Sequence, residues 1–377
     1  MLISVPREQF KDETRVPLLP SAVERLVQKG ASVGVETGLG LSINIDDDAY
    51  KKAGAVIEKE RSKLIASADC IVRIRKPDAE EIKTMKKGAI HISYLDPFNE
   101  SALVDICAKS GISAISLEMI PRTTLAQKMD VLSSQANIAG YAAVIIAAER
   151  INKVFPMMIT PSGTISPARV FIIGAGVAGL QAIATAKRLG ARVEAFDTRP
   201  AVAEQVQSLG AKFVKVDLGE TGETKNGYAK QLTQEQLDKQ RQAMAKQCSL
   251  ADVVITTAQV FGKKAPLIVT KDMIAGIKPG SVIVDLAVET GGNVEGSVAG
   301  KEVDINGVKI IGITNMPGQT AFDASLMFSN NICNFIDHFW NKEAKSININ
   351  TADEIMQGCL ITHNGSMCNK TLLSLNK

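Results

Sequence analysis

The sequence has few of the side chains that enzymes use for metal or general-base chemistry. Its 377 residues include three histidines, one tryptophan and six cysteines, and only 4% are aromatic. The cysteines are dispersed with no CxxC pair, so neither a disulfide framework nor a zinc site is indicated, and we expect reduced thiols. No Ser-His-Asp, paired-carboxylate or metal-ligand spacing stands out. We therefore predict no metal site.

Strong charge and long apolar runs are missing as well. The net charge is +3 with both signs mixed along the chain, so no nucleic-acid or anionic-lipid partner is expected. The start, "MLISVPREQF", carries Pro and charges where a signal peptide needs an apolar run. The longest apolar stretch, near Ala139–Ala148, is about half of the ~20 residues that a bilayer span requires. We predict a cytoplasmic protein without direct membrane insertion.

Short apolar runs alternate with helical patterns along the whole chain, which is typical of parallel, doubly wound sheets. The chain is too long for one compact core. The stretch "FPMMITPSGTISPAR" is expected to form a loop or hairpin, and "FDASLMFSNNICNFIDHFW" an amphipathic helix that returns to the first unit. We expect an α/β fold with two Rossmann-like doubly wound parallel-sheet domains, joined by long helices with a cleft between them. Domain 1 is residues 1–135 plus 321–377, and domain 2 is residues 136–320. The expected strands are Leu2–Val5, Ser32–Glu36, Cys70–Arg75, Ala89–Leu95, Ile112–Glu118, Val170–Ile173, Arg192–Asp197, Lys212–Val216, Asp252–Thr256, Ser281–Asp285 and Lys309–Ile313.

The strongest motif is the GxGxxG in "VFIIGAGVAGLQ", which lies between an apolar strand and a helix that opens at Val177. Gly174 permits a tight turn, Gly176 lets a pyrophosphate approach the backbone, and Gly179 lets the helix pack on the strand. The helix N-terminus favours that anion. The acid at the end of the next strand, Asp197, can accept from ribose hydroxyls.

The residues beside Asp197 bear on which dinucleotide binds. A carboxylate repels a 2′-phosphate, so the motif predicts NAD(H) and not NADP(H). Arg199 is a counter-signal, because an arginine can accommodate that phosphate; alternatively it makes a ribose or surface contact. Thr198 lies between the two and is a further candidate contact.

Three later segments add candidate contacts. The polar, Gly-rich stretch "LGETGETKNGYAKQ" is either a lid, with Gly227 and Tyr228 closing on the nucleotide, or an ordinary surface loop. Gln240 follows in the next helical pattern. The sequence "ITTAQVFGKKAP" puts Thr257, Ala258 and Gln259 at the carboxyl edge of a strand, where open α/β sheets bind ligands.

A further cluster of reaching side chains precedes the long apolar helix. The stretch "IPRTTLAQKMDVLSSQANIAGY" brings Arg122, Gln127, Lys128 and Asp130 close together. Nevertheless, no general base of the kind a dehydrogenase needs is evident. His91 in "AIHISYL" is expected to be a packed core residue, and the other two histidines have no catalytic context.

The whole chain resembles the family of alanine dehydrogenase and the NAD(H)-binding subunit of proton-translocating nicotinamide nucleotide transhydrogenase. The resemblance rests on "VPREQFKDETRVPLLPSAVERL", on "PRTTLAQKMDVLSSQANIAGY" and on "GYAK". It implies a loop in which Arg122, Gln127 and Asp130 lie against NAD(H) and face an NADP(H)-binding component. The other candidate contacts in this segment are Lys128, Met129 and Ser133.

The resemblance also marks what is absent. Alanine dehydrogenases pair a Lys in a "VKEP"-like strand end with a His in a "YLHLA"-like segment. Here "RIRKPD" has Arg75 at the Lys position, with Lys76 one step off register, and "SYLDPF" has Asp96 at the His position. Direct hydride transfer between two nicotinamides needs no base, only positioning.

The resemblance therefore implies a soluble subunit of the split type of transhydrogenase. We expect Gln127 and Asp130 to hold the nicotinamide and Arg122 to organise the interface with the NADP(H)-binding subunit. Separate membrane-spanning subunits would hold the protein on the cytoplasmic face of the inner membrane, and the family implies a homodimer. Two alternatives stay open: an NAD-dependent amino-acid or oxo-acid dehydrogenase, and a non-catalytic NAD-binding or sensing protein.

Overall fold

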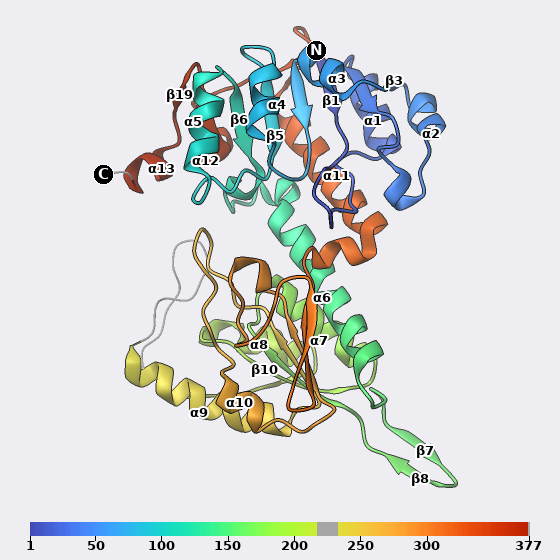
Figure 1. Ribbon diagram of the computed structural model, residues 1–377, viewed down its shortest axis with the longest axis vertical. Helices are drawn as coiled ribbons and strands as arrows, with labels where there is room; N and C mark the ends of the chain where they lie inside the picture. The colour runs from blue at the N-terminus through green and yellow to red at the C-terminus, as the bar shows by residue number, and fades with distance from the viewer. Residues whose placement is uncertain (217–232, 376–377) are drawn as a thin grey trace. The chain divides into compact units, whose positions relative to one another are not determined.

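The computed structural model describes residues 1–216 and 233–375 and divides the chain into two compact units (Figure 1). Unit 1 consists of Met1–Gln135 and Gly318–Lys377, and unit 2 of Ala136–Pro317. The chain thus enters unit 2 once and returns to unit 1 at Gly318, slightly before the residue at which the sequence predicts the crossing.

Unit 1 is built on a mixed sheet, eight-stranded among the described residues, in the order β19-β18-β6-β5-β4-β1-β2-β3. The strands from β3 to β6 are parallel, whereas β18 pairs antiparallel with β6 and β19 antiparallel with β18. The strands are β1 (Leu2–Val5), β2 (Ser32–Glu36), β3 (Val56–Glu58), β4 (Cys70–Val72), β5 (Ile90–Ser93), β6 (Ser113–Ser116), β18 (Leu360–His363) and β19 (Ser366–Met367), with a small separate pair β16 (Trp340–Asn341) and β17 (Ser346–Ile347).

Helices cover both faces of this sheet. Along β4, Cys70 and Val72 belong to one core cluster and Ile71 to another, which is the alternation expected of a strand buried on both faces. Helices α1 and α11 pack in the first cluster, and α4 and α5 in the second. The helices of unit 1 are α1 (Pro20–Gln28), α2 (Asp47–Lys52), α3 (Arg61–Ser67), α4 (Ala79–Thr84), α5 (Ser101–Lys109), α11 (Ala321–Phe339), α12 (Glu354–Cys359) and α13 (Lys370–Leu375), with the 3-10 turns η1 (Leu41–Ile43), η2 (Leu117–Met119) and η3 (Gln127–Met129).

Unit 2 has a sheet of seven described strands in the order β11-β10-β9-β12-β13-β15-β14. All neighbouring pairs are parallel except β14 with β15. The strands are β9 (Arg169–Ile173), β10 (Arg192–Phe196), β11 (Lys212–Phe213), β12 (Val253–Thr256), β13 (Val282–Asp285), β14 (Lys301–Ile305) and β15 (Val308–Gly312). Because β10 and β12 flank β9, the strand order reverses at the carboxyl end of β9.

The helices of unit 2 again lie on two faces. Along β9, Val170 and Ile172 share a core with α6 and α7, whereas Phe171 and Ile173 share one with α9 and α10. The bounds are α6 (Val131–Arg150), α7 (Val177–Arg188), α8 (Ala203–Ser208), α9 (Gln234–Leu250) and α10 (Lys271–Ala275), with the turns η4 (Pro200–Val202), η5 (Val288–Thr290) and η6 (Met316–Thr320). The hairpin of β7 (Met158–Thr160) and β8 (Gly163–Ile165) extends away from the rest of unit 2 (Figure 1).

Helix α6 is longer than the apolar run that argued against a membrane span. Among the described helices it is the one that is long and apolar enough to cross a bilayer, with a mean hydropathy of 1.5. A core helix of a soluble protein meets the same test. The alanines Ala142, Ala143 and Ala147 of α6 are buried in the core of unit 2, and this packing accounts for much of its apolar character.

The predicted fold class, α/β with parallel-dominated sheets in two Rossmann-like units, is confirmed. The expectation of purely parallel sheets is wrong at the edges, where β14, β18 and β19 run antiparallel. Several strands also end earlier than expected: β4 ends at Val72 and β11 at Phe213.

Candidate nucleotide site

The glycine turn after β9 is shaped by backbone contacts that only glycine allows. Gly174 has φ +99, and a Cβ there would lie 2.5 Å from the Thr257 hydroxyl oxygen. A Cβ on Gly179 would lie 1.9 Å from the Gly174 carbonyl oxygen, so only a hydrogen lets α7 approach β9 this closely. The fold itself therefore requires glycine at both positions.

Gly176 differs, because the fold does not require it. It is the N-cap of α7 with φ −77, which any residue adopts, and no heavy atom lies within 4 Å of a Cβ built there. The turn is thus open at Gly176, in front of the N–H groups that begin α7 and beside Val177, which is 41% exposed. The space is suited to an anion that needs close backbone approach.

Asp197 lies beside this turn and is held by two partners. Its Oδ2 accepts from the Ala175 N–H at 2.8 Å. The Arg199 guanidinium donates to Oδ1 and Oδ2 at 2.9 Å each, and the Arg199 N–H also donates to Oδ1 at 2.9 Å. Arg199, the counter-signal of the sequence, therefore neutralises the carboxylate in the nucleotide-free protein. Thr198 between them is half-buried.

Across the point where the strand order reverses, the segment after β12 is tied to the same turn. The Thr257 N–H donates to the Ile173 carbonyl at 2.9 Å, and its hydroxyl donates to the Gly174 carbonyl at 3.1 Å. Ala258 follows and is half-buried, and Gln259 is exposed with its amide donating to the Leu286 carbonyl at 3.0 Å. These residues lie where open α/β sheets bind ligands.

Two residues that the sequence did not single out as site residues support this segment. Asn293 is fully buried, and its side chain hydrogen-bonds to both the N–H and the carbonyl of Ala258, at 3.0 and 2.8 Å. Asp285, also fully buried, receives the Asn293 N–H at 3.0 Å. No local motif indicates them, because Asn293 lies far from Ala258 along the chain.

The remaining candidates of unit 2 are only partly visible. Gln240 is buried on α9, and its side-chain oxygen has no hydrogen-bond partner within residues 1–216 and 233–375. Gly227 and Tyr228, the residues of the expected lid, lie outside the described residues.

In unit 1, the segment from Arg122 to Ser133 is anchored by α11. The Asn331 and Asn334 amides donate to the Lys128 carbonyl at 2.9 and 3.1 Å, and Met129 is fully buried. Arg122, Gln127 and Lys128 have exposed or half-buried side chains, as a surface-facing loop requires.

Asp130 has a structural role in this segment. Its carboxylate accepts from the Ser133 N–H at 2.9 Å and from the Ser133 hydroxyl at 2.6 Å, which caps the start of α6. Gln127 is therefore the cleaner candidate for a contact to a ligand.

A second group in unit 1 shows what has become of the dehydrogenase positions. Glu13 is buried between Arg15, whose Nη2 donates at 2.6 Å, and Arg75, whose Nε donates at 2.8 Å. Burial raises the pKa of Glu13, but the hydrogen bonds and charges of the two arginines lower it more, and the net shift is downward. Asp96 lies in a turn with φ 52, where its N–H donates to Glu118 at 2.6 Å. None of these contacts produces a general base.

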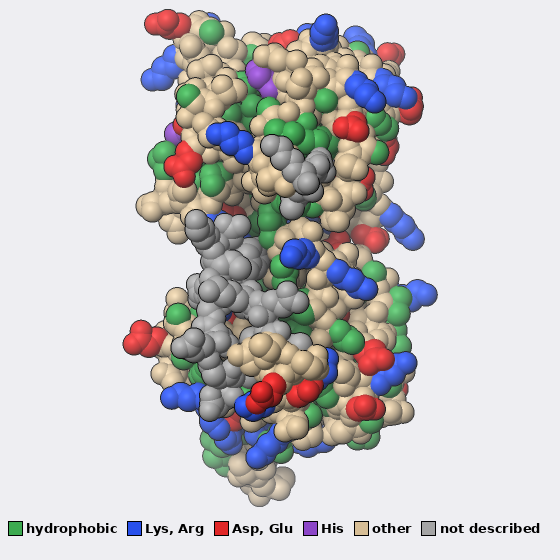
Figure 2. All heavy atoms as spheres, turned by 90° about the vertical axis from the view of Figure 1, so that its left-hand side faces the viewer, with side chains coloured by type: hydrophobic (Ala, Val, Ile, Leu, Met, Phe, Trp, Pro, Cys, Tyr) green, Lys and Arg blue, Asp and Glu red, His purple; other side chains and the backbone are tan. Residues whose placement is uncertain are grey.

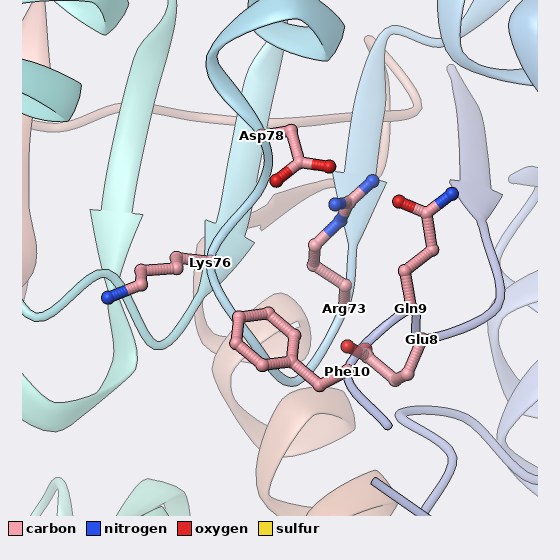
Figure 3. A pocket seen from close by; sticks show the side chains of 6 residues that line it. All are labelled: Glu8, Gln9, Phe10, Arg73, Lys76 and Asp78. Carbon is pink, nitrogen blue, oxygen red and sulfur yellow. The ribbon is translucent and has the colours of Figure 1, made fainter. Parts of the chain in front are cut away.

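Unit 1 also contains a small cavity of about 180 Å³, lined by Glu8, Gln9, Phe10, Arg73, Lys76 and Asp78 (Figure 3). It lies among segments that follow β1 and β4 and includes none of the predicted nucleotide contacts. Arg73 is buried and donates to Glu81 at 2.8 Å, while Lys76 points away from Arg73 and pairs with Glu100. The lining has two acids and two bases, so it favours neither sign of charge.

His91 is a core residue, as predicted. It is 1% exposed, and burial followed by the nearby charge of Arg73 lowers its pKa well below the ordinary value. Neither ring nitrogen has a hydrogen-bond partner in the described part of the chain. A neutral imidazole enclosed in this way is not placed to exchange protons with a ligand.

Charges on the surface are mixed. On the described part of the face in Figure 2, Lys or Arg and Asp or Glu side chains are interspersed. Within residues 1–216 and 233–375 no three His, Cys, Asp or Glu side chains gather where they could hold a metal ion. The chemistry on offer is therefore that of the glycine turn and its neighbours.

The fold and the glycine turn define a Rossmann-like protein of two α/β units. Residues 4–139 match the family described as "Alanine dehydrogenase/PNT, N-terminal domain" and residues 143–370 match its C-terminal domain. The chain belongs to this alanine dehydrogenase/PNT family. It is 43% identical over 379 residues to the first of the split pieces of NAD(P) transhydrogenase subunit alpha in Rhodospirillum rubrum, covering 99% of both chains.

Solved structures agree with this assignment. A transhydrogenase from Sinorhizobium meliloti is similar with a TM-score of 0.85 and 40% identity, over 98% of this chain and 100% of that chain. An L-alanine dehydrogenase has a TM-score of 0.82 at 24% identity, over 100% of this chain and 99% of its own, which shows a shared fold. The resemblance stated from the sequence is confirmed, and the protein is a member of a family of nicotinamide-nucleotide oxidoreductases.

Proposed function

We propose that this protein is the NAD(H)-binding subunit of a proton-translocating NAD(P)⁺ transhydrogenase. The observation that carries the proposal is the glycine turn of unit 2, open at Gly176 and flanked by Asp197. An open N-cap beside helical N–H groups suits a pyrophosphate, and a carboxylate at the end of the next strand suits ribose hydroxyls. On binding, the ribose replaces Arg199 as a partner of Asp197, and the carboxylate disfavours the 2′-phosphate of NADP(H).

The reaction we propose is direct hydride transfer from NADH to NADP⁺ held by a partner subunit. The hydride moves from one nicotinamide carbon to another, so no proton has to be removed and no base is needed. The locked Glu13–Arg75 pair supports this, because it leaves the dehydrogenase lysine position without a base. Catalysis then consists of bringing the two rings to reacting distance and excluding water.

In this proposal the exposed segment of unit 1 handles the reacting end of the cofactor. Gln127 reaches the nicotinamide carboxamide, Asp130 keeps the segment in place through its cap on α6, and Arg122 faces the partner's nucleotide domain. The hydrogen bonds from α11 to the Lys128 carbonyl support this role, because they fix the backbone while the side chains remain accessible.

The proposed partners are an NADP(H)-binding subunit and membrane-spanning subunits that couple hydride transfer to proton translocation. They hold the protein on the cytoplasmic face of the inner membrane. A second copy of this chain is also proposed as a partner. The hairpin β7–β8 supports it, since Met158, Ile159 and Ile165 are 43%, 74% and 45% exposed, and such apolar side chains gain from burial in a dimer.

A reconstitution experiment tests the proposed reaction. The purified protein should bind NADH alone, and it should reduce an NADP⁺ analogue only after a partner NADP(H)-binding domain is added. It should not convert pyruvate and ammonia to alanine. Alanine formation would instead support an amino-acid dehydrogenase, and NADH binding without hydride transfer in the mixture would support a sensing protein.

A further inference from the structure

A buried polar chain connects the loop after β13 to the glycine turn. It begins at Asp285, the last residue of β13, which is fully buried. Its oxygens accept from the N–H groups of Ala287 at 3.0 Å, Asn293 at 3.0 Å and Val294 at 3.3 Å, and from the Thr256 hydroxyl at 3.3 Å. All four donors are neutral. A buried carboxylate is costly unless such donors satisfy it, so it strongly constrains the loop.

The constraint fixes the position of Asn293. Its side-chain oxygen accepts from the Ala258 N–H at 3.0 Å, and its amide nitrogen donates to the carbonyls of Ala258 and Pro266 at 2.8 Å each. One amide thus binds both backbone groups of Ala258, as a neighbouring strand would. Ala258 is held in one orientation although β12 has already ended at Thr256.

The chain ends at the nucleotide turn itself. Thr257 precedes Ala258, and its hydroxyl donates to the carbonyl of Gly174, the first glycine of the turn. A shift of Ala258 would therefore move Thr257 and alter the turn. Rossmann-type motifs describe the turn and its acid, but they contain nothing corresponding to this support from two strands away.

We propose that Asn293, oriented by Asp285, is a positioning residue for dinucleotide binding. It acts through Ala258 and Thr257 on the turn at Gly174, and it need not touch the nucleotide. The inference rests on the nucleotide-binding half of the proposed function, and not on hydride transfer or on any partner subunit.

The most informative variant is Asn293→Asp, which keeps the shape and replaces the amide nitrogen by oxygen. Ionised, the introduced carboxyl repels the Ala258 and Pro266 carbonyls; protonated, it again donates to one of them. Burial among carbonyls raises the pKa of such a group. The affinity of the variant for NAD⁺ should be at least about tenfold weaker than that of the unaltered protein at high pH. It should recover as the pH falls between about 8.5 and 5.5.

The chain supplies a matched control in unit 1. Asn369 is 1% exposed, and its amide donates to the carbonyls of Gln357, Gly358 and Leu360, at 3.4, 2.9 and 3.3 Å. Asn369→Asp makes the same chemical change in an equally buried place away from the glycine turn. It should lower the melting temperature and leave NAD⁺ affinity unchanged at every pH.

Calorimetric titration of NAD⁺ across this pH range, well below each melting temperature, decides the matter. A pH-dependent loss confined to Asn293→Asp supports the inference. Unchanged affinity in that variant, or an equal loss in Asn369→Asp, overturns it. If Asn293→Asp does not fold, Thr257→Val tests the last link: several-fold weaker binding supports the inference, and unchanged binding overturns it. Failure of the unaltered protein to bind NAD⁺ would instead refute the nucleotide site.

Discussion

The role proposed for Gly176 can be tested without disturbing the fold, because the structure leaves room for a methyl group there. In Gly176→Ala the new Cβ has no heavy atom within 4 Å, and the φ of −77 is ordinary for alanine. Lower entropy of the unfolded chain stabilises the variant by about 0.4–1 kcal/mol. Alanine is a poorer N-cap than glycine by a similar amount, so we expect almost no change in the free energy of unfolding.

Nucleotide binding should respond very differently. A Cβ at the open position keeps a pyrophosphate from the N–H groups of α7 and removes at least one hydrogen bond to a charged group. Such a bond contributes about 1.5–3 kcal/mol, so the dissociation constant for NADH should rise roughly 10- to 150-fold. NADH fluorescence titration gives the affinity, and thermal unfolding of the same sample gives the stability.

Gly179→Ala is the matched comparison. There the Cβ would lie 1.9 Å from a backbone oxygen, which cannot move without displacing β9 or α7. We expect a loss of about 3 kcal/mol or more in stability. The informative contrast is a stable Gly176→Ala protein that binds NADH poorly beside a destabilised Gly179→Ala protein. A stable Gly176→Ala protein with unaltered affinity would refute the proposed position of the pyrophosphate.

Three other changes should have distinct signatures. Asp197→Asn removes the partner of Arg199, so NADH binding should weaken by about 1–3 kcal/mol while NADPH binding improves; titrations in which both affinities are unchanged would contradict the ribose assignment. Gln127→Asn shortens an exposed side chain by one methylene, so NADH affinity should be near normal while stopped-flow hydride transfer in the reconstituted complex falls roughly a hundredfold; an unimpaired rate would make the segment purely structural. The folded-state pKa of Glu13 is lowered, so its contribution to stability is full above about pH 4.3 and is lost as the pH falls through that lower value. Urea unfolding should show a shallower acid limb for Glu13→Gln, and an identical limb would mean that the pair with Arg15 and Arg75 contributes nothing.

The parts of the fold that the sequence predicts well are those governed by local patterns. The continuous apolar strand from Val253 to Thr256 and the turn after Ile173 are examples. The antiparallel edges fall outside the expectation drawn from apolar runs, although a local signal is present. Strands β14 and β15 are joined by Asn306 and Gly307, and β18 and β19 by Asn364 and Gly365, and all four residues have positive φ. Asn-Gly pairs of this kind are the strongest short hairpin signal.

The site divides in the same way. Gly174, Gly176, Gly179 and Asp197 lie in one strand–turn–helix–strand segment, so spacing alone identifies them as candidates. The bond from Asn293 to Ala258 joins loops 35 residues apart, and that from Arg75 to Glu13 spans 62 residues. Contacts of this range depend on how strands are ordered in the sheet, which a single sequence does not specify.

The discontinuity of unit 1 has a consequence for synthesis on the ribosome. Unit 2 is one continuous stretch, so it can complete its core while the chain is still being made. Unit 1 cannot, because Phe328, Ile332 and Phe335 of α11 fill its core and β18 extends its sheet. At about 5–20 residues per second, the apolar faces of β1 and α1 stay uncovered for many seconds after they emerge. The earliest segment of the chain is thus among the last to be buried, and chaperones that recognise exposed apolar segments should bind there first.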